Sequence, residues 1–315
     1  MLGIVILNWN GFQDTIECIE SLLKSEYQEF RIYLIDNFST DGSQKKLQTY
    51  ILDNNISDKV VLILNTENSG FAIGSNIGIR KALEHKCSYI WLLNNDTIVM
   101  PDTISKLINF MQTNKSQIVT PKILYYSEQS TIWNCGGKLC RFGFKRYYFN
   151  NQSITKCPDA SFKITFVTNC ASMFESSYFI KYGLLSEKFF FGEEDFEMSL
   201  RNLKNNVSMY CVPTSIIYHK VSSSICKDFS LEKKVRIDFL YYLNRMIDMK
   251  LFFNNSFIFK SYFALYRFYI VRLLKRKSYS QKTILSFVKK LKSLTSENNS
   301  VDKKMFDFIM NKIEI

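Results

Sequence analysis

The chain has 315 residues, which is enough for one large domain or for one domain with a substantial appendage. Its hydrophobic content of 46% and its four prolines exclude a low-complexity chain and favour a folded, non-repetitive protein. The eight cysteines lack the paired spacing of a zinc site and no signal peptide is apparent, so we expect reduced thiols in a cytoplasmic protein.

The net charge of +12 is concentrated near the C-terminus. Residues 1–230 hold 23 Lys and Arg against 22 Asp and Glu, whereas residues 231–315 hold 18 against 7. A near-neutral body with a basic tail predicts an anionic partner for the tail. No nucleic-acid-binding motif appears, so we expect no nucleic acid and consider an anionic membrane surface instead.

The first hundred residues alternate between short apolar, β-branched runs and segments of helical periodicity. The predicted strands are Gly3–Leu7, Arg31–Ile35, Val60–Leu64 and Tyr89–Leu93. Strand and helix in alternation predict an α/β fold with a parallel sheet and right-handed crossovers.

Each predicted strand ends in a polar cluster, and the carboxyl ends of parallel strands share one edge where such sheets bind ligands. The clusters are Asn8 with Asn10, Asp36, Asn68 with Gly70, and Asn94 to Asp96. Asp96 lies at an exposed strand end and supplies a hard anionic oxygen suited to Mg²⁺ or Mn²⁺. The alternative is that Asp96 only caps a following helix.

Glycines recur every four residues at positions 70, 74 and 78, so they line one face of a helix. They allow close approach, either of a ligand or of the helix to the sheet. Their spacing is neither the dinucleotide-binding Gly-x-Gly-x-x-Gly nor a Walker loop, which disfavours a dehydrogenase or an NTPase.

The second half carries an irregular segment and an acidic cluster. Residues 120–165 have little periodicity and form a candidate acceptor loop, in which Trp133 stacks on a sugar or is a core aromatic. Three carboxylates, Glu193, Glu194 and Asp195, follow the apolar Phe189–Phe191. Their crowding raises at least one pKa, as a general base requires; the alternative is an acidic first turn of a helix.

From Leu231 onward the pattern is helical. Leu251–Leu274 is rich in Phe, Tyr, Leu and Ile, but Lys260, Arg267 and Arg272 interrupt it, so a membrane-spanning helix is not expected. Two alternatives remain: residues 251–277 form an amphipathic helix at an anionic membrane surface, or they pack on the preceding domain.

Several segments together resemble glycosyltransferase family 2, in its bacterial rhamnosyltransferase-like branch, over about residues 1–250. In the donor half they are Val5-Ile-Leu-Asn-Trp-Asn-Gly11, Ile35-Asp-Asn-Phe-Ser-Thr-Asp-Gly-Ser43, Asn68-Ser-Gly-Phe-Ala-Ile-Gly-Ser-Asn-Ile-Gly78 and Leu92-Leu-Asn-Asn-Asp-Thr97. They continue as Ile132-Trp-Asn-Cys-Gly-Gly137, Phe166-Val-Thr-Asn-Cys170, Phe189-Phe-Phe-Gly-Glu-Glu-Asp195 and Tyr218-His-Lys-Val-Ser222.

The resemblance implies a GT-A nucleotide-sugar-binding fold with a mostly parallel central sheet and a C-terminal helical extension. It implies a catalytic domain at 1–230, with a donor half at about 1–100 and an acceptor and base half at about 101–230. The basic, aromatic extension is then 231–315.

The resemblance also implies roles for particular residues. Asp195 is similar to the family's catalytic base, with Glu194 beside it. Asp96 is similar to the metal-binding end of its Asp-x-Asp motif, which implies Mg²⁺ or Mn²⁺. His219 is similar to the family's site histidine, which contacts the metal or the diphosphate. Asn94 replaces the first Asp of that motif. The expected donor-binding residues are Asn8, Asn10, Asp36, Asn68, Gly70, Asn76 and Asn95. The candidate acceptor residues are Trp133, Gly136, Gly137 and Glu193.

Two functions follow as hypotheses. The first is an inverting, metal-dependent transfer of a sugar, such as L-rhamnose from dTDP-rhamnose, to a hydroxyl of a cell-surface polysaccharide or its lipid-linked precursor. This enzyme would be cytoplasmic or peripheral on the inner face of the membrane. The second is a catalytically silent nucleotide-sugar scaffold or sensor on the same fold.

Overall fold

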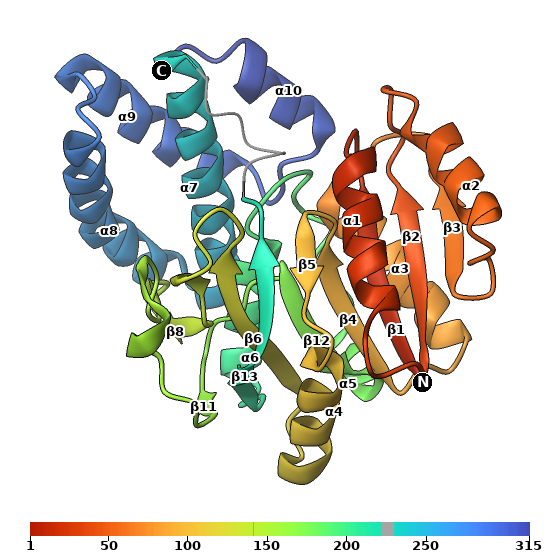
Figure 1. The fold of residues 1–315 in the computed structure, drawn as a ribbon. Helices are drawn as coiled ribbons and strands as arrows, with labels where there is room; N and C mark the ends of the chain where they lie inside the picture. The colour runs from red at the N-terminus through yellow and green to blue at the C-terminus, as the bar shows by residue number, and fades with distance from the viewer. Residues whose placement is uncertain (141, 222–229) are drawn as a thin grey trace.

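The computed structural model describes residues 1–140, 142–221 and 230–315; Ser222, at the end of the Tyr218–Ser222 motif, lies outside them. Within these residues an 11-stranded sheet forms the body, and a path of eight strands crosses it in the order β10-β7-β6-β12-β4-β1-β2-β3 (Figure 1). The strands are β1 (Leu2–Asn8), β2 (Phe30–Asp36), β3 (Val60–Leu64), β4 (Tyr89–Asn94), β5 (Thr97–Val99), β6 (Ile118–Tyr125), β7 (Thr131–Asn134), β10 (Gln152–Ser153), β11 (Phe162–Lys163), β12 (Ala171–Glu175) and β13 (Met209–His219). A separate hairpin pairs β8 (Gly137–Leu139) with β9 (Lys145–Tyr147).

The predicted parallel arrangement is confirmed for the four strands β3, β2, β1 and β4. Beyond them the sheet is mixed, because β12 lies antiparallel between β4 and β6. β13 runs parallel to β6 and also pairs antiparallel with β5, which brings the end of β13 back to the turn after β4.

Helices cover both faces of the sheet and continue into a C-terminal group (Figure 1). Those that contribute to the first layer are α1 (Phe12–Leu23), α2 (Ser43–Asp53) and α4 (Thr103–Asn114). The second layer contains α3 (Phe71–Glu84), α5 (Ser176–Tyr182) and Met198 of α6 (Glu194–Lys204). Ile154 of the short helix η1 (Ile154–Lys156) packs against the same core. The C-terminal group is α7 (Leu231–Phe253), α8 (Ser256–Arg276), α9 (Gln281–Glu297) and α10 (Lys303–Asn311).

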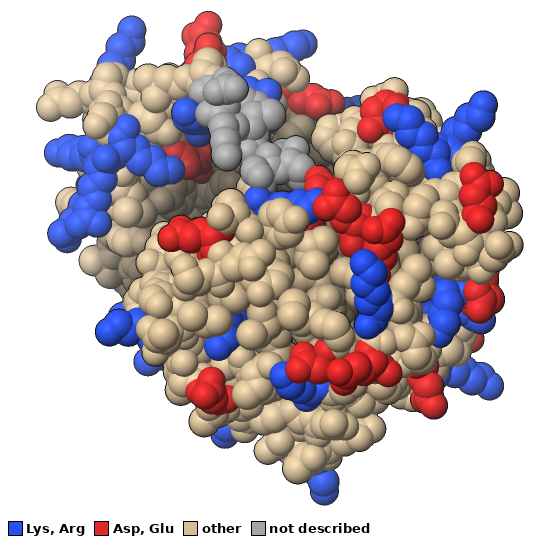
Figure 2. Space-filling view, in the orientation of Figure 1, with Lys and Arg blue, Asp and Glu red and all other residues tan. Residues whose placement is uncertain are grey.

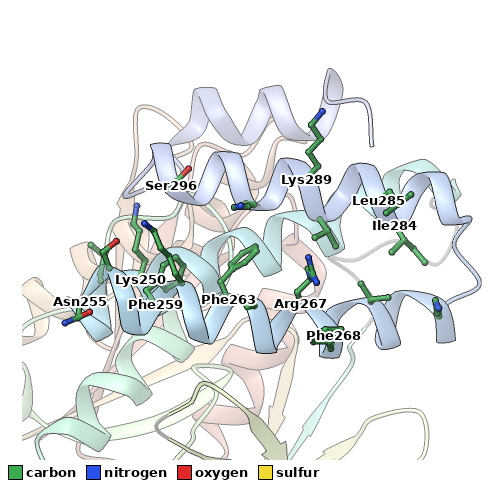
Figure 3. Close-up of a pocket in the computed structure, with 18 of the residues that line it drawn as sticks. Lys250, Asn255, Phe259, Phe263, Arg267, Phe268, Ile284, Leu285, Lys289 and Ser296 are labelled. Atoms are coloured by element: carbon green, nitrogen blue, oxygen red, sulfur yellow. The ribbon is translucent and has the colours of Figure 1, made fainter.

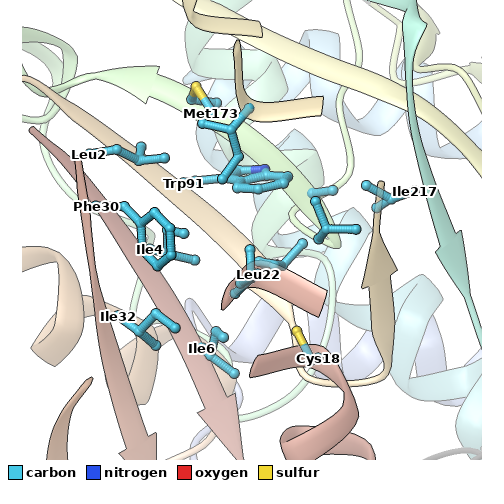
Figure 4. Packing of buried hydrophobic residues seen from close by; sticks show 14 of the residues in the cluster. Leu2, Ile4, Ile6, Cys18, Leu22, Phe30, Ile32, Trp91, Met173 and Ile217 are labelled. Carbon is cyan, nitrogen blue, oxygen red and sulfur yellow. The ribbon is translucent and has the colours of Figure 1, made fainter. Parts of the chain in front are cut away.

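Strand alternation divides the apolar residues of the central sheet between two cores. Leu2, Ile4 and Ile6 of β1 face the first layer, where Trp91 of β4 is fully buried among them (Figure 4). Val5 of β1 faces the second layer. The central strands are therefore buried on both sides, which is why they read as continuous apolar runs in the sequence.

The helix α3 lies close to the sheet because its glycines lack side chains. A Cβ at Gly74 would lie 2.6 Å from Cδ1 of Leu7, and one at Gly78 would lie 2.5 Å from Cγ1 of Val5. At these two positions the glycines serve helix-on-sheet packing, the second of the two alternatives that their spacing left open.

The C-terminal helices share a core with α6. Phe196 and Leu200 of α6 are buried together with Phe239 and Leu243 of α7. Within the described part of the chain, no helix is long and apolar enough to cross a membrane.

Candidate functional site

The ends of β1 and β2 meet through a saturated hydrogen-bond cluster around Asp36. The strands are in parallel register with Asn8 opposite Asp36. Asn8 Nδ2 donates to Asp36 Oδ2 at 2.7 Å, while the amide and hydroxyl of Ser39 donate to the same carboxylate at 2.9 and 2.6 Å. Asp36 and Asn8 are fully buried, so they hold the shape of this loop.

Exposed groups surround this cluster. Asn10 Oδ1 accepts a hydrogen bond from the amide of Thr40 at 2.7 Å, which joins the loops after β1 and β2. Trp9 is 55% exposed and Phe38 is 46% exposed, and Phe38 has a φ of 64°, a conformation that bulky residues rarely adopt. These two aromatic faces beside the expected nucleotide site are features that the sequence interpretation missed.

Asn68 and Gly70 belong to the same edge of the sheet. Asn37 Nδ2 donates to Asn68 Oδ1 at 2.9 Å and to the carbonyl of Gly70 at 3.2 Å. Gly70 directly precedes α3 and has a φ of 83°, and a Cβ there would meet the carbonyl oxygen of Phe190. Gly70 is therefore required both by its backbone conformation and by close packing.

The other two expected donor residues have different surroundings. Asn95 Nδ2 donates to Thr15 Oγ1 at 2.9 Å, and Thr15 in turn donates to Asn8, so Asn95 joins the cluster at β1. Asn76 is fully buried and bonds through both ends of its amide to the segment at Leu185 and Glu187. The structure thus places Asn76 at a packing contact rather than with the other donor residues.

Asp96 and His219 face each other directly. The antiparallel pairing of β5 with β13 places His219 opposite Thr97, and His219 Nε2 lies 3.1 Å from Asp96 Oδ1. Both residues are buried, so the expectation that Asp96 lies at an exposed strand end is wrong. The ring of Trp133 packs edge-on against the imidazole at a centroid distance of 4.4 Å.

Asp96 and His219 have the side chains of ligands that could fill part of the coordination shell of a divalent cation. No group of three or more His, Cys, Asp or Glu in the described ranges could hold a metal ion by itself. One carboxylate and one imidazole fit a Mg²⁺ or Mn²⁺ ion that takes its other ligands from substrate phosphates and water. The buried Nδ1 of His219 has no hydrogen-bond partner among the described residues, which is unusual for a purely structural histidine.

A cavity of about 540 Å³ adjoins this pair and contains the acidic cluster. Asn94, Trp133 and His219 contribute to its lining from the sheet side, and Glu193, Glu194 and Asp195 from the start of α6. The other residues that line it are Phe71, Asn134, Lys145, Tyr147, Asn150, Thr168, Asn169, Cys170, Phe191, Gly192, Asp238, Tyr241, Tyr242 and Arg245. The cavity thus brings together most of the predicted metal-side and base residues.

The acidic cluster is held by a buried ion pair. Glu193 directly precedes α6 and has a left-handed φ of 67°. Arg245 of α7 donates two hydrogen bonds to its carboxylate, from Nε at 3.0 Å and from Nη2 at 2.7 Å. Lys145 Nζ of β9 lies 3.6 Å from the same carboxylate. These contacts with Arg245 and Lys145 fix the side chain of Glu193, and the next two residues, Glu194 and Asp195, line the cavity.

The three carboxylates titrate differently because their surroundings differ. Burial opposes ionisation of Glu193, but Arg245 and Lys145 outweigh it and lower the pKa of Glu193. Burial and then the charge of Asp195 raise the pKa of Glu194 to about 8. Burial raises the pKa of Asp195 to about 6, against the opposing effect of Lys145. Near neutral pH, Asp195 can therefore accept a proton while Glu194 retains one.

The remaining acceptor candidates divide into two kinds. Trp133 is partly exposed and lines the cavity, whereas Gly136 and Gly137 do not. A Cβ at Gly136 would meet Ile164, and one at Gly137 would lie 2.4 Å from the carbonyl oxygen of Arg146. These glycines permit close backbone packing of the β8–β9 hairpin.

Several cavity residues were not expected from the sequence. Tyr241 and Arg245 lie in the extension predicted at 231–315, and Lys145 lies in the irregular segment. These residues belong to no sequence motif. The one signal for them is the requirement that a buried carboxylate such as that of Glu193 has a cation as partner. The helix α7 is therefore part of the site.

The mixed sheet with its flanking helices is a GT-A fold. The sequence model of Glycosyl transferase family 2 matches residues 3–183, more than half of the chain, and the chain belongs to that family.

Curated relatives agree with this assignment. The chain is 30% identical over 129 residues to the glycosyltransferase GlyG of Streptococcus pneumoniae, covering 41% of this chain and 40% of that protein. It is 23% identical over 223 residues to the dTDP-rhamnosyl transferase RfbF of Shigella flexneri, covering 71% of this chain and 70% of that protein. The match thus spans well under half of GlyG but most of RfbF.

Solved structures share the fold. GalNAc-T7, solved with UDP, GalNAc and Mn²⁺, aligns with a TM-score of 0.65 at 17% identity, covering 99% of this chain and 56% of that chain. The mannosyltransferase PcManGT of Pyrobaculum calidifontis, solved with GDP-Man and Mn²⁺, aligns with a TM-score of 0.55 at 10% identity, covering 79% and 62%.

We expect Arg245→Met to lower the free energy of unfolding by about 3–5 kcal/mol, because it leaves the buried carboxylate of Glu193 without its main partner. The double variant Arg245→Met/Glu193→Gln should recover much of that loss. Urea denaturation measures both. Lys234→Met, at an exposed position of the same helix, is the control and should change stability by no more than about 0.5 kcal/mol. A small loss in Arg245→Met would show that the pair does not hold the acidic cluster.

Proposed function

We propose that the chain is an inverting, metal-dependent glycosyltransferase that moves L-rhamnose from dTDP-rhamnose to a hydroxyl of a cell-surface polysaccharide or its lipid-linked precursor. The likeness to RfbF over 71% of the chain supports this donor, because that protein is a dTDP-rhamnosyl transferase. We further propose that it works at the cytoplasmic face of a bacterial membrane, with residues 251–277 near an anionic surface.

One observation carries the proposal of catalysis: Asp195, with its raised pKa, lines the same cavity as His219 and Asn94. Displacement of the diphosphate by the acceptor's hydroxyl needs a base near that hydroxyl and a group that stabilises the leaving diphosphate. The cavity holds residues of both kinds, which disfavours the alternative of a catalytically silent scaffold or sensor.

In the proposed mechanism the acceptor hydroxyl gives its proton to Asp195 while its oxygen attacks the anomeric carbon. The bond from that carbon to the diphosphate oxygen breaks, and the configuration inverts. Glu194, which is protonated near pH 7, orients the acceptor by donating a hydrogen bond. Glu193 takes no proton and positions the other two through Arg245.

Donor recognition is assigned to the edge formed by β1, β2 and α3. Asn10, Asn68 and Gly70 contribute from loops that Asp36 and Asn8 hold in place. We assign the exposed rings of Trp9 and Phe38 to contact with the nucleobase. Asp96 and His219 would hold the Mg²⁺ or Mn²⁺ ion, which supplies positive charge to the diphosphate as it leaves.

We expect Asp195→Asn to retain donor binding and to lose roughly two to four orders of magnitude in kcat, because Asn has the same shape but cannot accept the proton. Turnover with dTDP-rhamnose and calorimetric binding of the same compound measure the two effects. Asp53→Asn, at an exposed carboxylate of α2, is the control and should keep full activity. A larger loss in Glu193→Gln or Glu194→Gln would assign the base to a different carboxylate.

The pH dependence of kcat/KM should reflect the titration of Asp195. Because the proposed base works in its deprotonated form, kcat/KM should fall about tenfold per pH unit below pH 6, the pKa of Asp195. An ordinary aspartate would place this limb near pH 4. Rates measured between pH 4 and 9, with donor affinity followed over the same range, separate the base from effects on binding. An acidic limb centred at pH 4 would contradict the assignment.

The cation should depend on Asp96. We expect Asp96→Asn to abolish the strengthening of dTDP-rhamnose binding by Mn²⁺, because a carboxylate oxygen is a far better ligand for this ion than an amide. Asp14→Asn is the matched control: Asp14 pairs with Lys220, the neighbour of His219, at 2.7 Å. Calorimetry with and without Mn²⁺ measures the difference. Full wild-type turnover in excess chelator would refute the metal role.

A further inference from the structure

A large groove lies between α8 and α9, separate from the catalytic cavity. Its volume is about 1410 Å³, and its lining begins at Lys250 and ends at Ser296. Figure 3 shows Phe259, Phe263 and Arg267 projecting from α8 on the side of α9, and Lys289 on α9. None of the residues that line this groove lines the catalytic cavity.

The walls of the groove are more apolar than the packing of α8 requires. This helix buries Tyr262, Tyr266, Ile270 and Leu274, which are spaced by four residues and therefore form one face. Apolar side chains nevertheless continue around the helix. The most exposed of those on α8 and α9 are Phe257 at 78%, Leu285 at 72%, Leu265 at 71% and Phe268 at 66%. Of these four side chains, Phe268 and Leu285 line the groove, and large exposed apolar side chains at a groove are typical of a binding site.

The rim of the groove is uniformly basic. Residues 249–296 contain eleven Lys and Arg and no Asp or Glu. Figure 2 shows blue side chains gathered over this end of the molecule. Six of these cations line the groove, and within the described ranges none of the six forms an ion pair: Lys250, Lys260, Arg267, Lys275, Lys289 and Lys292.

We propose that this groove binds an anionic phospholipid, with an acyl chain along the apolar walls and the phosphate at Arg267 and the surrounding lysines. Such a ligand satisfies both features at once, because it joins a hydrocarbon chain to a negative charge. A lysine at the groove such as Lys260 suits this geometry, since a long stem can lie on apolar surface while the ammonium group reaches the phosphate layer.

This inference rests on the membrane part of the proposed function and sharpens it to one site and one class of lipid. An isolated cationic surface would bind any polyanion, and an isolated apolar groove would bind any apolar helix. The absence of every carboxylate from residues 249–296, together with the exposed aromatic side chains, favours the lipid.

The test is sedimentation of the full chain with vesicles. We expect strong binding to vesicles of phosphatidylcholine containing phosphatidylglycerol and weak binding to phosphatidylcholine alone, with loss of binding as salt is raised. Because the assay measures no turnover, a chain that binds these vesicles but transfers no sugar leaves this inference standing, and an active chain that binds none overturns it.

Two variants separate the contributions of the groove. Lys260→Gln/Arg267→Gln should weaken vesicle binding about 25-fold, at about fivefold for each cation removed. Phe268→Ser/Leu285→Ser should weaken it to a similar extent without unfolding the chain, because both side chains are largely exposed. The matched control is Lys24→Gln/Lys45→Gln, exposed lysines at the donor end of the molecule, and it should bind like the wild type.

Three further results would overturn the proposal. Equal binding to neutral and anionic vesicles would remove the charge argument, and unchanged binding in both groove variants would place any lipid contact elsewhere. A dimer in analytical ultracentrifugation that Phe268→Ser/Leu285→Ser dissociates would show that a second copy of the chain covers the groove.

Discussion

The buried pairing of Glu193 with Arg245 is the interaction on which the arrangement of the acidic cluster depends. Glu193 has a left-handed backbone conformation that residues with a side chain rarely adopt. The bidentate contact with Arg245 holds its carboxylate, and the next two residues, Glu194 and Asp195, line the cavity. As a result, the surroundings of Glu194 and Asp195 give them different pKa values. Such a difference is the usual way in which one site obtains both a proton acceptor and a proton donor.

The opposite side of the site is built from neutral polar side chains rather than charges. Asn8, Asn37 and Asn95 join the ends of successive strands through amide hydrogen bonds, with Asp36 as the one carboxylate in that network. Amides can donate and accept at once, so a few of them fix several loops without leaving an unpaired buried charge. This explains why the loops of the donor half contain so many asparagines.

The sequence predicted the donor half well because its signals are local. Continuous apolar runs identified the strands, and polar residues at their ends identified the edge at which Asn8, Asp36 and Asp96 lie. The mixed half was harder to predict, since the insertion of β12 between β4 and β6 depends on contacts between segments far apart in the chain. Lys145 and Arg245 were missed for the same reason: a cation that pairs with a distant buried carboxylate has no pattern in its own neighbourhood. Asn76, which matches a family motif, has its amide in a packing contact.

The connection between α7 and α8 has a mechanical consequence. Only Asn254 and Asn255 separate the two helices, and Asn254 takes a left-handed conformation while Asn255 caps α8. Such a short, hydrogen-bonded joint transmits orientation, because it leaves few torsions free to absorb rotation. Tyr241 and Arg245 on α7 line the catalytic cavity, so any surface that holds α8 also fixes the direction in which the cavity opens. Under the proposed function, the catalytic cavity would then lie at a fixed distance from that surface and would reach only acceptor hydroxyls at that distance.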